Sequence, residues 1–131
     1  MFTLLRRPIA VALILAACSS SNTLAPRFQP QISNKADNFA FQATGVDNVS
    51  QTLTYTWNCS SGTAMVNPST TTSAGSVALL IKDGAGTTVY DGGIPPSGIF
   101  NTNPAGTAGS WTIRVMFTDY SGTINFRVQK F

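Results

Sequence analysis

The last 23 residues of the chain, Gly109–Phe131, alternate apolar and polar side chains more regularly than any other stretch. Large apolar residues occupy every second position in two runs, with Thr118–Gly122 between them: Trp111, Ile113, Val115 and Phe117, then Ile124, Phe126 and Val128. Alternation with a period of two is typical of strands that bury one face. Because a glycine-containing segment joins the two runs, the pattern predicts an antiparallel hairpin with one buried face.

Shorter alternating stretches precede this region and indicate further strands. Every second residue is apolar in Asn38–Thr44 and in Gln51–Asn58, and the second stretch carries threonines on its other parity, which suits a solvated sheet face. Val77–Ile81 and Thr87–Tyr90 flank the turn residues Asp83–Gly86 and predict a second hairpin. No stretch shows helical periodicity. Seven or eight short strands therefore predict an all-β, antiparallel β-sandwich.

The first 17 residues have the composition of a targeting segment. Arg6 and Arg7 precede nine mostly apolar residues, Ile9–Ala17, about half of the ~20 that a membrane-spanning helix needs. A charged start, a short apolar run and small residues at its end are typical of a secretory signal peptide. We expect this segment to be cleaved.

Leu15-Ala16-Ala17-Cys18 resembles the bacterial lipobox. The resemblance implies that Cys18 is acylated and becomes the mature N-terminus, and Ser19 is similar to the residue found in lipoproteins sorted to the outer membrane. Two or more acyl chains give stable anchoring, since each buried methylene contributes about 0.8 kcal/mol. The expected organisation is a lipoprotein signal peptide at 1–17, a lipidated cysteine with a flexible tether at 18–35, and a β-sandwich domain at 36–131.

Two stretches of the expected domain resemble a known type of accessory domain. Val77–Val89 is similar to the strand–Gly-Thr–strand hairpin of the P domain of proprotein convertases and of the bacterial pre-peptidase C-terminal domain. Gly109–Val115 followed by Gly122–Asn125 resembles the end of the same fold. The resemblance implies a jelly-roll β-sandwich that binds or stabilises and carries out no chemistry. The plan of lipobox, tether and one threonine-rich sandwich also resembles small bacterial lipoproteins.

The residue types present argue against an enzyme and against a nucleic-acid-binding protein. The chain has no His and no Glu, the residues that most often serve as general bases near neutral pH. Without Arg6 and Arg7, six Lys and Arg remain against five Asp, so no basic surface for nucleic acid is expected. Cys59 shares the parity of Trp57 and is expected to be a buried structural thiol without a partner.

Residues 91–108 form the longest stretch without clear alternation, and long irregular loops in compact domains are often functional. Phe100, with Tyr90 or Tyr120 nearby, is the candidate aromatic contact of a binding loop. The alternative is that Phe100 closes one end of the core as a short strand or lid.

Asp83, Asp91 and Asp119 occupy expected loop tips and are the weak candidates for metal ligands. Backbone carbonyls there could complete the six to eight oxygens that calcium requires. Aspartate followed by glycine is also simply what tight turns use. No cofactor is expected on this balance, with calcium as the alternative.

The sequence therefore predicts a lipid-anchored, non-catalytic interaction or structural module of the bacterial cell envelope, at the outer membrane. The alternative is a carbohydrate-binding or adhesion module, with or without stabilising calcium, that presents its loops at the outer membrane. The expected partners are the membrane, through the lipid, and an envelope protein or glycan.

Overall fold

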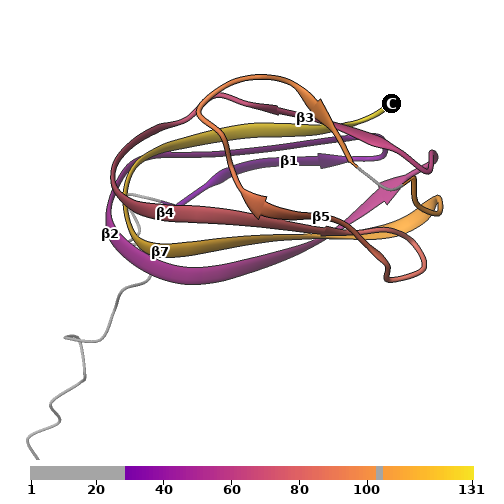
Figure 1. Ribbon diagram of the computed structural model, residues 1–131, viewed down its shortest axis with the longest axis horizontal. Helices are drawn as coiled ribbons and strands as arrows, with labels where there is room; N and C mark the ends of the chain where they lie inside the picture. The colour runs from indigo at the N-terminus through magenta and orange to yellow at the C-terminus, as the bar shows by residue number, and fades with distance from the viewer. Residues whose placement is uncertain (1–28, 103–104) are drawn as a thin grey trace, which may run out of the picture.

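The computed structural model describes residues 29–102 and 105–131, and seven β-strands lie in these ranges (Figure 1). They are β1 (Gln31–Lys35), β2 (Asn38–Cys59), β3 (Ala64–Pro68), β4 (Thr71–Lys82), β5 (Thr88–Gly93), β6 (Phe100–Asn101) and β7 (Gly109–Lys130). Cys18 and the predicted signal peptide lie outside the described residues. Within the described ranges, no helix has the length and apolar character needed to cross a membrane.

The fold is organised by β2 and β7, two antiparallel strands of 22 residues each. The first half of β2 pairs with the second half of β7, with Phe41 opposite Phe126. The second half of β2 pairs with the first half of β7, with Trp57 opposite Trp111. Gly109–Lys130 is therefore one bent strand whose halves both pair with β2, and the hairpin predicted in this region is wrong.

The two halves of β2 and β7 lie in different layers. One layer, here called the β1 sheet, has the strand order β1, β2 (first half), β7 (second half), β3 and β6. The other, here called the β4 sheet, has the order β2 (second half), β7 (first half), β4 and β5. Figure 1 shows these layers stacked and joined where β2 and β7 bend. This order is that of a jelly roll with β1 added at one edge, so the predicted fold class is confirmed.

The bend explains why a turn-like sequence does not make a turn. The β2–β7 register shifts three times between Ala43 and Gln51, as β-bulges do where strands change sheets. Asn48 and Asp119 have positive φ angles of 47° and 44° on the two strands. Gly75 of β4, at φ 69°, packs against Asp119 so closely that a Cβ there would collide with the Asp119 carbonyl oxygen. The polar Gly, Asn and Asp residues therefore form a corner rather than a reversal.

The core between the sheets contains the residues that alternation assigns to it. Phe39 and Tyr55 come from opposite halves of β2, and their ring centroids are 5.4 Å apart. The largest fully buried side chains are those of Trp57, Trp111, Tyr120, Phe39, Phe41, Phe126, Leu79, Ile81, Ile113, Ile124, Val49 and Val66. The predicted inward parity of both runs in β7 is thus confirmed although their pairing was wrong.

Two boundaries differ from the sequence-based expectation. Residues 31–35, assigned to the tether, form β1 and pair with β2 from Gln31 opposite Gln42 to Lys35 opposite Asn38. Thr71–Lys82 is a continuous strand that begins six residues before the expected Val77–Ile81, and its first residues pair with Thr123 and Gly122 at the bend. Both segments are polar because they lie at an edge or a corner of the sandwich. Polarity alone does not separate such strands from loops.

Candidate functional site

The structure places the three candidate aromatic residues in two different parts of the molecule. Tyr90 and Phe100 are half-buried and their rings are 4.8 Å apart, and both pack against the core from the β5–β6 side. The Tyr90 hydroxyl donates to the Gly93 carbonyl at 2.6 Å. Phe100 lies opposite Val66 in the two-residue strand β6. Phe100 therefore closes the side of the core, as the alternative interpretation predicted.

Tyr120 is fully buried at the bend, so its assignment to an exposed binding loop is wrong. Its ring packs 5.7 Å from that of Phe117, and its hydroxyl donates to the Thr71 carbonyl at 3.2 Å. The register shift around Val49 turns Tyr120 toward the core.

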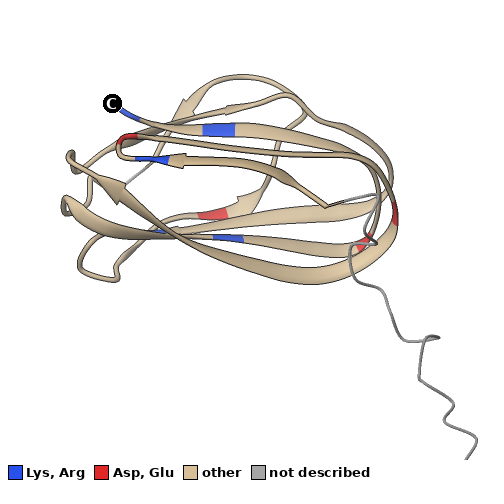
Figure 2. Ribbon diagram, turned by 180° about the vertical axis from the view of Figure 1, so that it is seen from behind, with Lys and Arg blue, Asp and Glu red and all other residues tan. Residues whose placement is uncertain are grey.

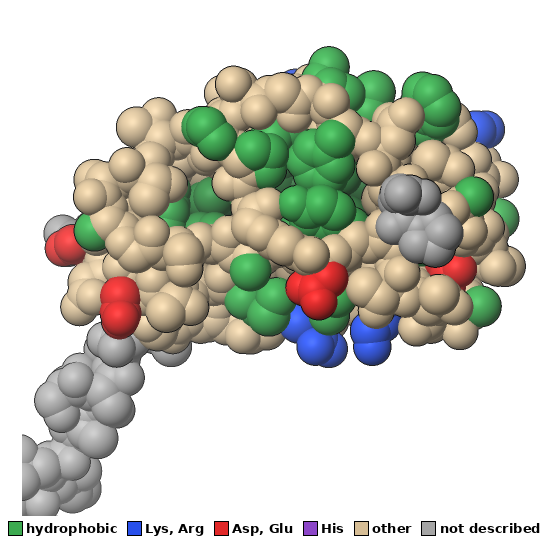
Figure 3. Space-filling model, viewed as in Figure 1, with side chains coloured by type: hydrophobic (Ala, Val, Ile, Leu, Met, Phe, Trp, Pro, Cys, Tyr) green, Lys and Arg blue, Asp and Glu red, His purple; other side chains and the backbone are tan. Residues whose placement is uncertain are grey.

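Figure 3 shows hydrophobic side chains gathered between β3 and β5. Ile99, which directly precedes β6, has 61% of its surface accessible.

Asp83 is buried and its oxygens are occupied by the protein backbone. Oδ1 accepts hydrogen bonds from the N–H groups of Ala85 (2.9 Å) and Thr87 (2.8 Å), and Oδ2 accepts one from Thr107 (2.8 Å). Burial raises the pKa of this carboxyl, but the backbone hydrogen bonds outweigh burial and hold the pKa below its ordinary value. Asp83 thus joins the β4–β5 turn to the segment that directly precedes β7, and a metal ion would have to displace these donors.

Asp91 and Asp119 do not complete a metal site with Asp83. Both are exposed, and in the described part of the chain no three Cys or Asp side chains are grouped closely enough to hold a metal ion. Asp119 forms a reciprocal pair with Ser50, whose hydroxyl donates to Oδ1 at 3.2 Å and accepts from the Asp119 N–H at 2.9 Å. Of the three weak metal candidates, Asp83 therefore lies in the β4–β5 turn, Asp119 at the corner and Asp91 within the strand β5.

Cys59 is buried at the end of β2, and its thiol donates to the Ser61 carbonyl at 3.4 Å. Burial raises the pKa of this thiol above its ordinary value. A protonated, enclosed thiol is a poor nucleophile. The expectation of a buried structural thiol is confirmed.

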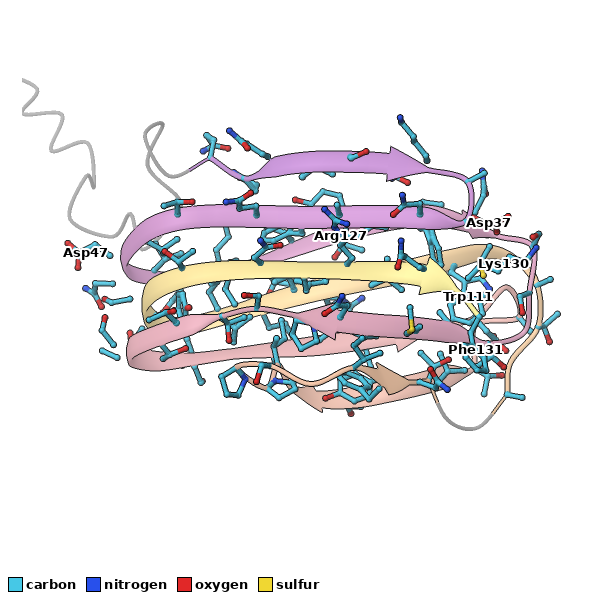
Figure 4. The ribbon with its side chains drawn as sticks, turned by 90° about the horizontal axis from the view of Figure 1, so that it is seen from above. Asp37, Asp47, Trp111, Arg127, Lys130 and Phe131 are labelled. Carbon is cyan, nitrogen blue, oxygen red and sulfur yellow. The ribbon has the colours of Figure 1, made fainter. Side chains whose placement is uncertain are left out.

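The surface that offers a candidate binding site is the outer face of the β1 sheet. A groove of about 260 Å³ crosses β1, β2 and β7 there. It is lined by Gln31, Ile32, Ser33, Ala40, Phe41, Gln42, Asn125 and Arg127. In Figure 4, which looks onto this face, Arg127 lies in the middle of the sheet.

The pairing register arranges the groove's side chains in two rows. One row runs from Gln31 through Gln42 to Asn125, and the next runs from Ser33 through Ala40 to Arg127. Neighbouring strands are about 4.8 Å apart, so each row spans about 10 Å. Ala40 carries only a methyl group between longer neighbours and forms the low point of the groove. Amides and a hydroxyl, all able to donate and accept hydrogen bonds, surround it.

Arg127 is exposed between the buried residues Phe126 and Val128, which fixes its side chain on the outer face. No ion pair or side-chain hydrogen bond to Arg127 occurs within the described residues. Asn67 of β3 lies opposite Arg127 in the pairing register of β3 and β7. The guanidinium is therefore available to a ligand that lies in the groove.

The charges of this face are of one sign. Its outward positions include Lys35 and Arg127 but no Asp. The acids lie elsewhere: Asp37 in the β1–β2 turn, Asp47 and Asp119 at the bend, and Asp83 and Asp91 at the β4–β5 side. Figure 2 shows acidic segments at the bend, at the opposite end of the molecule and in the middle of one strand, and basic segments along the strands. The face therefore presents a positive potential next to neutral hydrogen-bonding groups.

Sequence reasoning missed this groove. Its signal lay in the outward positions of the strands, where Asn125 and Arg127 alternate with buried residues, but such positions are usually just solvated. Only the pairing of β2 with both β1 and β7 brings Gln31, Gln42 and Arg127 together. That pairing joins residues almost one hundred positions apart, beyond any local pattern.

Comparison with known proteins gives no family for this chain. No family model matches it, and no curated protein does. Thirteen chains of solved structures match. The C-terminal CBM6 of LamC, a marine laminarinase from Zobellia galactanivorans, has a TM-score of 0.37 and 11% identity, over 77% of this chain and 88% of that one.

Procruciferin, an 11S globulin from Brassica napus, has a TM-score of 0.41 and 14% identity. That match covers 98% of this chain but 33% of procruciferin, so the chain spans about a third of its length. Neither likeness assigns a ligand or an activity to this chain. Neither of these two structures supports the finer resemblance to P domains or pre-peptidase C-terminal domains; the strand order of the chain itself shows the β-sandwich.

Proposed function

We propose that the chain is a lipid-anchored, non-catalytic binding module of the bacterial cell envelope. The observation that carries the binding role is the groove on the β1 sheet, because it offers an unpaired guanidinium and several amides in one hollow. The groove has hydrogen-bonding groups but no acid–base pair or activated nucleophile, so it is suited to hold a ligand without transforming it.

The proposed anchor is Cys18, in Leu15-Ala16-Ala17-Cys18. The chain enters the domain at the bend, because Gln31 pairs with Gln42, directly before the first register shift. Eleven residues separate Cys18 from Pro30 and could reach at most about 40 Å. A lipid at Cys18 would therefore hold the bend within that distance of the membrane. The outer face of the β1 sheet would then point to the side of the molecule and not toward the membrane. The outer membrane is the proposed location.

The carbohydrate-binding alternative also has an observation in its favour, although the candidate site is now the outer face of the β1 sheet and no longer the loops. The aromatic residues expected to contact a glycan are occupied in the core, whereas the groove offers the amide, hydroxyl and guanidinium groups that bind sugar hydroxyls and acids. We treat carbohydrate as the first ligand class to test for this groove.

The anchor is tested by expressing the full chain in a Gram-negative host with an alkyne-tagged fatty acid. Mass spectrometry of the membrane fraction should find the acyl groups on the peptide that begins at Cys18. The variant Cys18→Ser should lose both the label and the membrane association. Unlabelled protein with an intact N-terminal segment, or equal membrane association of both forms, would contradict the anchor.

The binding role is tested with a photo-crosslinking amino acid at one of two exposed positions. Gln42 lies in the groove, and Thr54 lies on the outer face of the opposite sheet. In intact cells, Gln42 should give an envelope adduct that Thr54 does not give. Equal adducts from both positions, or none from either, would argue against a binding role for this face.

A further inference from the structure

We propose that the groove centred on Ala40 binds an acidic polysaccharide, with Arg127 pairing to a sugar carboxylate. This inference rests on the proposed binding role and names the ligand class for the same groove. Its basis is the combination of one unpaired guanidinium, a surrounding set of neutral hydrogen-bonding groups and a face without carboxylates.

The charge pattern selects an anion. Arg127 and Lys35 are outward on the β1 sheet, and no Asp shares that face. A guanidinium offers five N–H donors in a planar fork that matches a carboxylate with two parallel hydrogen bonds. A neutral ligand would leave this group without a partner in a covered site.

The neutral groups select a ligand with many hydroxyls. Gln31, Gln42 and Asn125 form one row, and Ser33 lies at the end of the next. Each amide can donate and accept at once, as a sugar hydroxyl does. A simple inorganic anion would use only the guanidinium and leave these groups unused. The outer-face residues of the groove include no aromatic side chain, so binding depends on charge and hydrogen bonds rather than on stacking of sugar rings.

The shape of the groove favours an extended chain that crosses the strands. The low point at Ala40 lies between Ser33 on β1 and Arg127 on β7, both small or flexible, and Asn67 continues the row on β3. A peptide would instead add alongside the edge strand β1 through backbone hydrogen bonds. The polar row across the sheet provides side-chain contacts from several strands, which suits a polysaccharide.

The probe is polygalacturonate, with its fully methyl-esterified form as a comparator of the same backbone without charge. Binding is measured by titration calorimetry with the full-length lipidated protein in detergent. We expect the acidic polymer to bind and the methyl ester to bind at least about tenfold more weakly, the change expected when a charged hydrogen bond is lost. Equal binding of the two polymers, or no binding of polygalacturonate, would overturn the proposal.

Arg127→Gln is the decisive variant, and Arg114→Gln is its matched control. Both arginines lie on β7, but Arg114 lies on the outer face of the β4 sheet, between Thr54 and Leu80. Arg127→Gln should weaken binding of polygalacturonate at least about tenfold, whereas Arg114→Gln should leave it within about twofold. Equal weakening by both would show non-specific attraction to the basic protein and overturn the site.

Two further measurements complete the test. Ala40→Gln fills the low point without changing charge and should weaken binding while leaving the melting temperature unchanged; unchanged binding would place the ligand elsewhere. Poly-aspartate should bind more weakly than polygalacturonate, and equal binding would reduce the site to a general anion site. If Cys18 is acylated and Gln42 gives its selective adduct while polygalacturonate fails, the ligand class is wrong and the proposed function stands.

Discussion

The indole of Trp111 meets that of Trp57 edge-on across the β2–β7 pair, with ring centroids 5.7 Å apart and planes at 83°. Both side chains are fully buried. The Nε1 of Trp57 donates to the Lys35 carbonyl and that of Trp111 to the Thr107 carbonyl, each at 2.9 Å. The pair therefore fixes two connecting segments, the end of β1 and the approach to β7, to the core at the end opposite the bend.

Trp111→Ala is expected to lower the free energy of unfolding by about 3–5 kcal/mol, because it leaves a large cavity and an unpaired carbonyl at Thr107. Chemical denaturation gives the value. Thr56→Ala, at an exposed position on β2, is the control and should change stability by less than about 0.5 kcal/mol. A loss below about 1 kcal/mol for Trp111→Ala would mean that the indole is not part of the core.

The variants Phe100→Ala and Ile99→Ala test whether Phe100 covers the core or belongs to an exposed loop. Phe100 is half-buried on Tyr90 and Val66, so its removal should cost about 1–3 kcal/mol of stability. Ile99 directly precedes Phe100 and is 61% exposed, so Ile99→Ala should lower stability by less than about 0.5 kcal/mol. Thermal melts of the two variants make the comparison. An equally small loss of stability from both substitutions would mean that Phe100 does not close the core and would support the binding loop that the sequence suggested.

Asp83→Asn should destabilise the protein at neutral pH, because the amide nitrogen cannot accept the backbone N–H bonds that the carboxylate accepts. The folded pKa lies below the reference value of 3.8, so this stabilisation is complete above that value and is lost as the pH falls through the folded pKa. The difference in melting temperature between native protein and variant should therefore shrink as the pH is lowered below about 4.

Asp91→Asn, at an exposed position of β5, is the matched control for Asp83 and should leave the melting temperature at pH 7 unchanged. Melting curves from pH 7 to pH 2 test both variants. A difference that stays constant over this range would mean that the Asp83 carboxylate does not contribute through its charge.

Cys59 should react slowly with a maleimide in the native protein and rapidly after unfolding in guanidinium chloride. The reason is that the thiol is buried and burial raises its pKa. Mass spectrometry of the peptide that contains Cys59 follows the reaction at both conditions. Equal rates would show that the end of β2 opens readily and that the thiol is available for chemistry.

Local patterns predicted the core well and the topology poorly. Alternation identified the inward side chains of Phe39, Phe41 and Trp111 because burial on a strand depends only on parity. Alternation could not distinguish a hairpin turn from a bend within one continuous strand, because Gly122 and Asp119 are compatible with both. The correct choice depends on β2, which bends at the same place and supplies partners to both halves of β7.

The candidate site was harder to predict than the fold. Asp83 and Tyr120 looked exposed because they lie in or next to turn-forming segments, but they form hydrogen bonds to distant backbone groups, those of Thr107 and Thr71. Conversely, Gln42 and Arg127 looked like ordinary solvated positions. Their proximity depends on pairings between the ends of the chain, which no local property of the sequence encodes.

The central position of β7 in both sheets also determines when the chain can fold. Its partners in β2 precede it by 50 residues, for Cys59 and Gly109, to 91 residues, for Asn38 and Gln129. Neither sheet can close before β7 has paired with β2, and such long-range pairing is intrinsically slow. The two layers are therefore expected to form together, in the single step in which β7 pairs along the whole length of β2.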